Sequence, residues 1–292
     1  MLKAAYFANP DVAQFVTWLS ETLASDAPNH TYVVAGDAVP IVFNGLSTAL
    51  IQYRWPFSFV APGADVVTTG SSYSDSVTAL NCLRAGLVAA LASTSDRATR
   101  DWAKAVMKWG GVTNGNSKWL DSNCAGLAAH VNSTQALLVQ HDDAMKGRIT
   151  RFNAGMTKIY SLIVEDFVMY DSRVAAALAW FVAKWCHETE KAVVPTPLCF
   201  RCLRPKEAPG ARTRKLRNPS CSHYRFPWIN TPTQHAHWNQ RASWVLSAVL
   251  AAVRDTSFHL QPTSSRALEA AFFMWGYDLG ASPLCSSGGS LK

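Results

Sequence analysis

The spacing of the apolar residues constrains this chain most, because it fits α-helices over most of the length. Along residues 172–190 the apolar side chains recur at every third or fourth position, which places them on one side of a helix. These residues are Val174, Leu178, Phe181, Val182 and Trp185. Similar patterns recur along the rest of the chain, so the sequence predicts a mainly α fold.

Capping residues set the ends of several predicted helices. Asn9 before Pro10 is a typical helix start, and this helix is expected to run to about Ala24. A second starts after the Ser95-Asp96 cap and ends at Gly110-Gly111. Further helices are predicted over residues 76–92, 132–138, 142–151, 157–164, 172–190, 235–254 and 265–277. Residues 32–43 are predicted to form small strands or extended chain, and residues 111–123 to form a loop.

The positive charge is concentrated in one segment. The formal net charge is +7, and between Lys191 and Trp228 there are nine Lys or Arg residues against the single acid Glu207, a local excess of about +8 by the usual charge states. Most of this segment lies in a Pro- and Arg-rich insertion, residues 194–234, that has no helical period. One basic patch on an otherwise nearly neutral chain is typical of a protein that binds nucleic acid. A solvated basic loop without a partner is the alternative.

The composition favours a cytoplasmic protein without a membrane partner. The longest apolar runs, Val174–Ala183 and Val245–Val253, fall short of the roughly 20 residues that a membrane span needs. Asn9, Pro10 and Asp11 interrupt any apolar run that would mark a secretory signal. Seven cysteines scattered through the chain fit a reducing compartment better than a disulfide framework. We expect a monomer.

The candidate catalytic residues are a lysine and an aspartate thirteen positions apart. Lys158 lies in the first turn of one predicted helix, after a turn that contains Gly155, and Asp171 lies at the start of the next. The exposed N–H groups of a helix start attract phosphate, and Arg173 adds a cation there. Taken singly, the lysine also fits a solvated surface charge and the aspartate an ordinary N-cap.

Together with their flanks, these residues resemble the helix-hairpin-helix DNA glycosylases, in particular the 8-oxoguanine glycosylase branch. That family carries a Gly-x-Gly-Thr-Lys-Val turn followed by Val-Asp-x-His. Here Thr157-Lys158-Ile159 matches the first motif and 170–174 the second, while only Gly155 remains of the hairpin glycines. The wider pattern, including Trp109-Gly110-Gly111, is similar to bacterial 8-oxoguanine-glycosylase-like proteins, one group of which acts in defence against phages.

The resemblance implies a single two-lobed helical glycosylase domain over residues 1–292, with a helix-hairpin-helix-type element. The catalytic helix pair would be residues 153–190, and the basic, irregular insertion would be residues 194–234. Lys158 carries over as the amine nucleophile, Asp171 as the catalytic carboxylate, and Arg173 stands where the family has a phosphate-binding histidine. With the insertion, the predicted DNA-binding residues are Gly155, Thr157, Ser172, Arg173, Arg212, Arg214, Lys215 and Arg217.

The implied activity is excision of a flipped-out modified base from double-stranded DNA, without a cofactor, leaving an abasic site, with or without lyase activity. Because the hairpin is reduced and the insertion is large, we expect a phage-defence enzyme that removes glucosylated hydroxymethylcytosine. Repair of 8-oxoguanine is the first alternative. The others are a non-catalytic helical DNA-binding protein and an unrelated helical protein whose lysine and aspartate are a surface charge and a cap.

Two further groups of residues have side chains suited to binding. Aromatic residues in loops or at helix ends are candidates for a base pocket or wedge, and the Asn amide beside one of them can read a base edge. These candidates are Arg54, Trp55, Trp109, Trp238 and Asn239. Trp180, Trp185, Trp244 and Trp275 lie at helical spacing and are expected in the core. Cys199, Cys202, Cys221 and His223 have the ligand types of a structural zinc site, although incidental thiols in a loop are the alternative.

Overall fold

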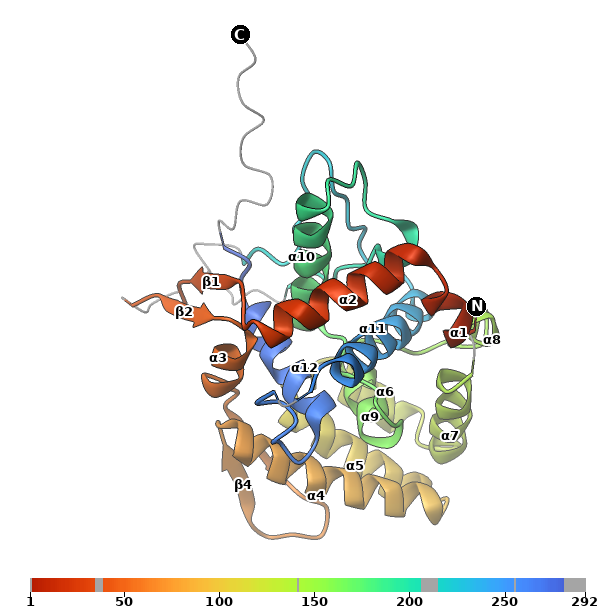
Figure 1. Ribbon diagram of the computed structural model, residues 1–292. Helices are drawn as coiled ribbons and strands as arrows, with labels where there is room; N and C mark the ends of the chain where they lie inside the picture. The colour runs from red at the N-terminus through yellow and green to blue at the C-terminus, as the bar shows by residue number, and fades with distance from the viewer. Residues whose placement is uncertain (1, 35–38, 141, 206–214, 255, 281–292) are drawn as a thin grey trace. The chain divides into compact units, whose positions relative to one another are not determined.

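The computed structural model describes residues 2–34, 39–140, 142–205, 215–254 and 256–280. Helices make up most of these residues (Figure 1), so the mainly α class is confirmed. They divide into two compact units. Unit 1 comprises Met1–Leu2, Tyr53–Met169 and Thr231–Gln240, and unit 2 comprises Lys3–Gln52, Tyr170–Asn230 and Arg241–Lys292. Lys158 therefore belongs to unit 1 and Asp171 to unit 2.

Unit 1 is a set of helices with one short antiparallel hairpin, in which Phe57 pairs with Gly70 and Val60 with Val67. Its elements are β3 (Phe57–Val60), β4 (Val67–Gly70), α4 (Tyr73–Ala92), α5 (Asp96–Trp109), α6 (Asn116–Ser122), α7 (Leu127–Leu138), α8 (Asp142–Met145), α9 (Met156–Ile163) and the first part of α11 (Pro232–Ala252). The predicted cap at Ser95 is confirmed, because its hydroxyl accepts the N–H of Ala98. Helices α4 and α5 pack against each other.

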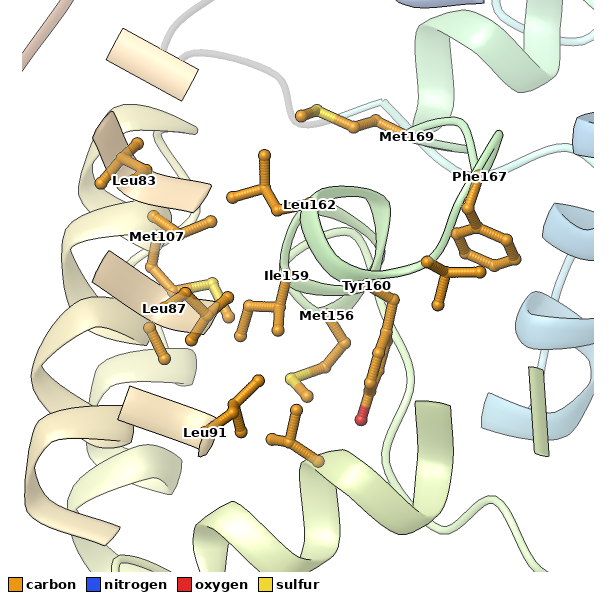
Figure 2. Close-up of a cluster of buried hydrophobic side chains, with 14 of the residues drawn as sticks. Leu83, Leu87, Leu91, Met107, Met156, Ile159, Tyr160, Leu162, Phe167 and Met169 are labelled. Atoms are coloured by element: carbon orange, nitrogen blue, oxygen red, sulfur yellow. The ribbon is translucent and has the colours of Figure 1, made fainter. Parts of the chain in front are cut away.

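The short helix α9 packs into the core of unit 1. Figure 2 shows Ile159, Met156 and Leu162 of this helix beside leucines of α4 and Met107 of α5. Each of these apolar side chains contributes about 1.5–3 kcal/mol when it is fully removed from water. An isolated helix of eight residues would not be stable in water. Packing of its apolar side chains is therefore what holds α9 in place.

Unit 2 is built on α10, α12 and α2, around a core rich in aromatic rings. Its elements are α1 (Lys3–Phe7), α2 (Pro10–Ala24), β1 (Asn29–Tyr32), β2 (Ile41–Asn44), α3 (Leu46–Ile51), α10 (Ser172–Glu188), the 3-10 helix η1 (Thr196–Leu198), the rest of α11, and α12 (Ser264–Trp275). Trp185 and Trp275 are fully buried and Trp180 nearly so, as predicted, whereas Trp244 is only half-buried. The Asn9 cap of α2 is also confirmed.

Several predicted elements were wrong for identifiable reasons. Part of residues 111–123 forms helix α6, which begins after Gly115 in the left-handed region. The helix predicted over 142–151 ends at Met145, because Gly147 adopts a positive φ of 72° that does not continue a helix. The strands β3 and β4 were not predicted.

Helix α4 also bears on the prediction that no segment spans a membrane. Within the described part of the chain, this is the one helix whose length and mean hydropathy would suffice to cross a bilayer, and it was missed because polar residues interrupt its apolar runs. Leu83 and Leu87 on its inner side are fully buried in unit 1. A single helix of this kind is weak evidence for a membrane span, because a core helix has the same composition.

A glycine allows α12 to approach α10 closely. A Cβ atom at Gly276 would lie 1.9 Å from the backbone oxygen of Arg173 and 3.0 Å from the backbone nitrogen of Ala177. Backbone atoms inside a helix cannot move aside independently. The substitution Gly276→Ala is therefore expected to lower the free energy of unfolding by about 1–3 kcal/mol, measured by urea denaturation.

The matched control for this prediction is Gly110→Ala. Gly110 has a φ of −79°, and the nearest atoms to an added Cβ are side-chain carbons of Lys158, which can shift. We expect a much smaller loss of stability for this variant. Equal losses for both variants would contradict the close approach of α12 and α10.

Candidate active site

Lys158 is buried within unit 1, contrary to the usual position of a lysine. Its side chain is 5% exposed, and its Nζ donates a hydrogen bond to the backbone oxygen of Ala154 at 3.3 Å. The methylene carbons lie over Gly110, where an added Cβ would be 2.4 Å from Cδ and 2.6 Å from Cε. The residue packs in this position because α9 is buried around it. Burying an amine costs free energy, so the fold keeps this lysine inside at the expense of stability.

Two of the predicted pocket tryptophans lie beside the same pair of glycines. The Trp55 indole Nε1 donates to the backbone oxygen of Trp109 at 3.0 Å, and a Cβ at Gly111 would meet the Trp55 ring at 3.3 Å. Trp109 is buried, whereas Trp55 is half-buried and Arg54 is exposed. Unit 1 thus brings Lys158, the Gly110-Gly111 turn and a partly accessible aromatic ring together. Of the two tryptophans, Trp55 is the one whose ring is partly accessible.

Gly155 and Thr157 were predicted to bind DNA, and the structure gives both of them partners within the protein. Both are buried. The N–H groups of Gly155 and Met156 are donated to Asn153 Oδ1, at 2.9 and 3.1 Å. The Thr157 hydroxyl donates to Asn239 Oδ1. The backbone N–H groups at the start of α9 and the Thr157 hydroxyl are therefore used in hydrogen bonds within the protein.

Trp238 and Asn239 were predicted to line a base pocket, and the structure places both in the interior. Trp238 is 8% exposed and Asn239 is fully buried. The Asn239 amide donates to the backbone oxygen of Val168 at 2.8 Å, and its oxygen accepts from Thr157. Both sides of the amide are therefore used to tie α11 to α9 and to the segment that follows it, and we assign Asn239 a structural role.

Asp171 caps α10 in unit 2, as the sequence predicts. Its Oδ1 accepts the N–H groups of Arg173 at 2.9 Å and of Val174 at 3.2 Å. The residue is half-buried. These two hydrogen bonds fix the carboxylate at the helix start. A carboxylate held in this way can stabilise positive charge that develops on a bound molecule.

Three cations gather around one tyrosine ring in unit 2. The Arg173 guanidinium lies 4.1 Å from the centroid of the Phe273 ring and 4.7 Å from that of Tyr277. Lys215 Nζ lies 4.9 Å and the Arg217 guanidinium 5.9 Å from the same tyrosine ring. Sequence reasoning named the cations and missed the aromatic residues, which lie about 100 positions away from Arg173 and carry no motif.

Arg217 joins the basic insertion to the start of α10. It is 6% exposed, donates from Nη1 to the Ser172 hydroxyl and from Nε to the backbone oxygen of Tyr277 at 3.0 Å. The neighbouring carboxylate of Asp278 accepts the N–H of Leu216 at 3.0 Å. Arg217 and Ser172 therefore contact each other and shape this surface, whereas the sequence predicted that each binds DNA directly.

The charges around Arg173 affect its titration. The pKa of the Arg173 guanidinium is lowered to about 10, mainly by burial and also by the positive charge of Arg217, while the Asp171 carboxylate opposes the shift. At neutral pH Arg173 keeps its charge. A phosphate beside this group would gain two or three cationic partners and relieve their mutual repulsion. Arg212 and Arg214, the other predicted DNA-binding residues of the insertion, lie outside the described residues.

The four predicted zinc ligands are not gathered into a site. Among the described residues, no three His, Cys, Asp or Glu side chains lie together in a way that would hold a metal ion. The Cys199 thiol donates to the backbone oxygen of Arg225 at 3.4 Å. Burial raises the pKa of the Cys202 thiol, which disfavours the thiolate that binds zinc. His223 pairs with the Ser222 hydroxyl, and Cys221 is disulfide-bonded, so it has no thiolate to offer a metal ion.

Comparison with known proteins adds no relative. No protein-family model matches the chain, and no curated protein or solved structure matches it.

The capping role of Asp171 gives a direct stability prediction. Asp171→Ala removes both acceptor bonds to the start of α10 and should lower the free energy of unfolding by about 1 kcal/mol, whereas Asp171→Asn retains a good cap and should change it by a few tenths. Denaturant unfolding of the two variants beside the parent protein measures this. If Asp171→Asn were as costly as Asp171→Ala, capping would not be what the side chain contributes.

Proposed function

We propose that this protein is a DNA glycosylase that excises a modified base from double-stranded DNA. The observation that carries the proposal is the burial of Lys158, 5% exposed, at the position where the motif resemblance expects an amine nucleophile. A solvated surface lysine, the main alternative, does not explain that burial. The motif also expects an aspartate at the next helix start, where Asp171 caps α10.

The chemistry follows from the groups that these residues supply. A base within a duplex must be flipped out before its glycosidic bond can be reached. The sugar gains positive charge as that bond breaks, and the Asp171 carboxylate is the group that would stabilise it. The half-buried Trp55 ring beside Gly111 offers an aromatic face for the extruded base.

Lys158 is proposed to attack the sugar as the neutral amine. A bond forms between Nζ and C1′ while the bond from C1′ to the base breaks, and its electron pair leaves with the base, which takes up a proton. Loss of the amine proton and opening of the sugar ring give a Schiff base at C1′. Water hydrolyses it and restores the lysine, or β-elimination cleaves the strand first.

We propose glucosylated hydroxymethylcytosine in phage DNA as the modified base, ahead of 8-oxoguanine. The N–H groups at the start of α9 are donated to Asn153, so this turn differs from a hairpin that binds phosphate through its backbone. The cations come instead from α10 and the insertion. Base release from duplexes that carry one or the other base decides between the two substrates.

Reductive trapping tests the nucleophile. Incubation of the parent protein with abasic-site DNA and borohydride should give a covalent adduct, because borohydride reduces the Schiff base to a stable amine. Lys158→Gln should lose the adduct by at least 100-fold on a denaturing gel. No adduct together with no base release from any modified DNA would overturn the enzyme proposal and favour a non-catalytic DNA-binding protein.

Gly110→Ala is the matched test of how the amine is placed. The added Cβ would lie within 2.6 Å of Cδ and Cε of Lys158, so the lysine must shift while its chemistry is unchanged. We expect trapping to slow by about tenfold or more, since a misplacement of about 1 Å can cost 100-fold in rate. Unchanged trapping in a correctly folded variant would show that Gly110 does not position the amine.

Asp171→Asn tests the carboxylate without disturbing the helix start. The asparagine keeps the cap and removes the negative charge, so base release should fall by at least 100-fold while DNA affinity stays within about threefold. Retained base release would show that another group stabilises the charge on the sugar.

A further inference from the structure

The described residues of the basic insertion form a short paired ribbon in unit 2. Cys202 and Trp228 form a parallel β-bridge, in which the Cys202 N–H donates to Pro227 at 3.0 Å and the Ile229 N–H donates to Cys202 at 2.9 Å. We call residues 199–204 and 225–229 the insertion ribbon. The sequence predicted an irregular segment here, and the structure shows that part of it is paired.

The ribbon carries buried apolar side chains and exposed arginines. Phe200, Cys202 and Phe226 are buried, whereas Arg204 and Arg225 are exposed. The two exposed arginines are therefore the side chains of the ribbon that are available to a partner.

An arginine–tryptophan stack joins the two segments of the ribbon. The Arg204 guanidinium lies 5.0 Å from the centroid of the half-buried Trp228 ring, and Arg201 Nη1 donates to the backbone oxygen of Trp228 at 2.8 Å. Residues 191–205 and 215–230 contain no Asp or Glu. The Trp228 indole therefore has Arg201 and Arg204 beside it, and residues 191–205 and 215–230 supply no carboxylate to neutralise them.

The ribbon is fixed beside the start of α10. The hydroxyl of Tyr170, a fully buried residue, donates to the backbone oxygen of Arg201 at 2.7 Å. Tyr170 directly precedes Asp171, the cap of α10. The ribbon is therefore anchored to the residue that precedes the proposed catalytic carboxylate.

We propose that the insertion ribbon binds a DNA strand, with an unpaired base stacked on Trp228 and the neighbouring phosphates paired with Arg204 and Arg225. A base presents a flat π-face that extends the stack begun by Arg204, and base–aromatic stacking tolerates any sequence. An acidic peptide would use the cations and leave the indole without a role. The choice of DNA as the ligand rests on the proposed function. Binding of a strand to the ribbon does not itself require glycosylase activity.

Fluorescence anisotropy with the full-length protein tests the ribbon, using a single-stranded oligonucleotide and a fully paired duplex as probes. Trp228→Ala should weaken binding of the single strand by about tenfold and binding of the duplex by much less. Trp228→Phe keeps an aromatic face and should lose less than threefold, which guards against a simple folding defect. Arg204→Gln should weaken the binding of both probes and reduce the salt dependence of that binding, since one phosphate contact is lost.

Arg84→Gln is the charge-matched control, because Arg84 is exposed on α4 of unit 1. Single-strand binding by Trp228→Ala and Arg204→Gln at the level of Arg84→Gln would overturn the proposal. An equal loss of affinity for a polyglutamate peptide in Trp228→Ala would overturn base stacking. Base release is measured in parallel and separates the two proposals. If the parent protein releases no base but Trp228→Ala still loses strand binding, the glycosylase proposal fails and the strand-binding proposal stands.

Discussion

The burial of α9 in unit 1 is the constraint on which the candidate site depends. This helix has eight residues and is held by apolar contacts with α4 and α5 (Figure 2). Its polar neighbours reinforce the same placement, because Asn153 takes the first N–H groups and Asn239 binds Thr157. Lys158 is carried into the interior as a consequence, and Gly110 leaves the space for its stem. The position of the amine is therefore set by the core.

A second set of contacts organises the start of α10 in unit 2. Asp171 accepts two backbone N–H groups, and Arg217 of the insertion donates to Ser172 and to the backbone of Tyr277. Arg173 is held against two aromatic rings that follow or belong to α12. The Asp171 and Asp278 carboxylates lie beside these cations and offset part of their repulsion. The insertion contributes cations to this surface that the motif alone does not contain, and the proposed function would use them to bind phosphate.

Local signals in the sequence predicted the helices well and the site unevenly. The caps at Asn9, Ser95 and Asp171 were readable because each acts within three residues of its helix. Lys158 was found through its motif, but its burial was not predicted, since that depends on packing with α4 and α5. Asn239 and Thr157 were assigned to DNA because their 82-residue separation hides the hydrogen bond between them. The stack of Arg204 on Trp228 was not predicted for the same reason, because the pairing of the ribbon brings together residues that are distant in sequence.

The most direct test of the central claim is to identify the residue that carries the DNA after reductive trapping. The parent protein is trapped on abasic-site DNA with borohydride and digested with nuclease and protease, and the modified peptide is sequenced by mass spectrometry. The account predicts one modified residue, Lys158, with the sugar remnant on its side-chain nitrogen. A remnant on another amine, such as Lys191 or Lys215, or the absence of any adduct from a protein that releases bases, would contradict Lys158 as the nucleophile.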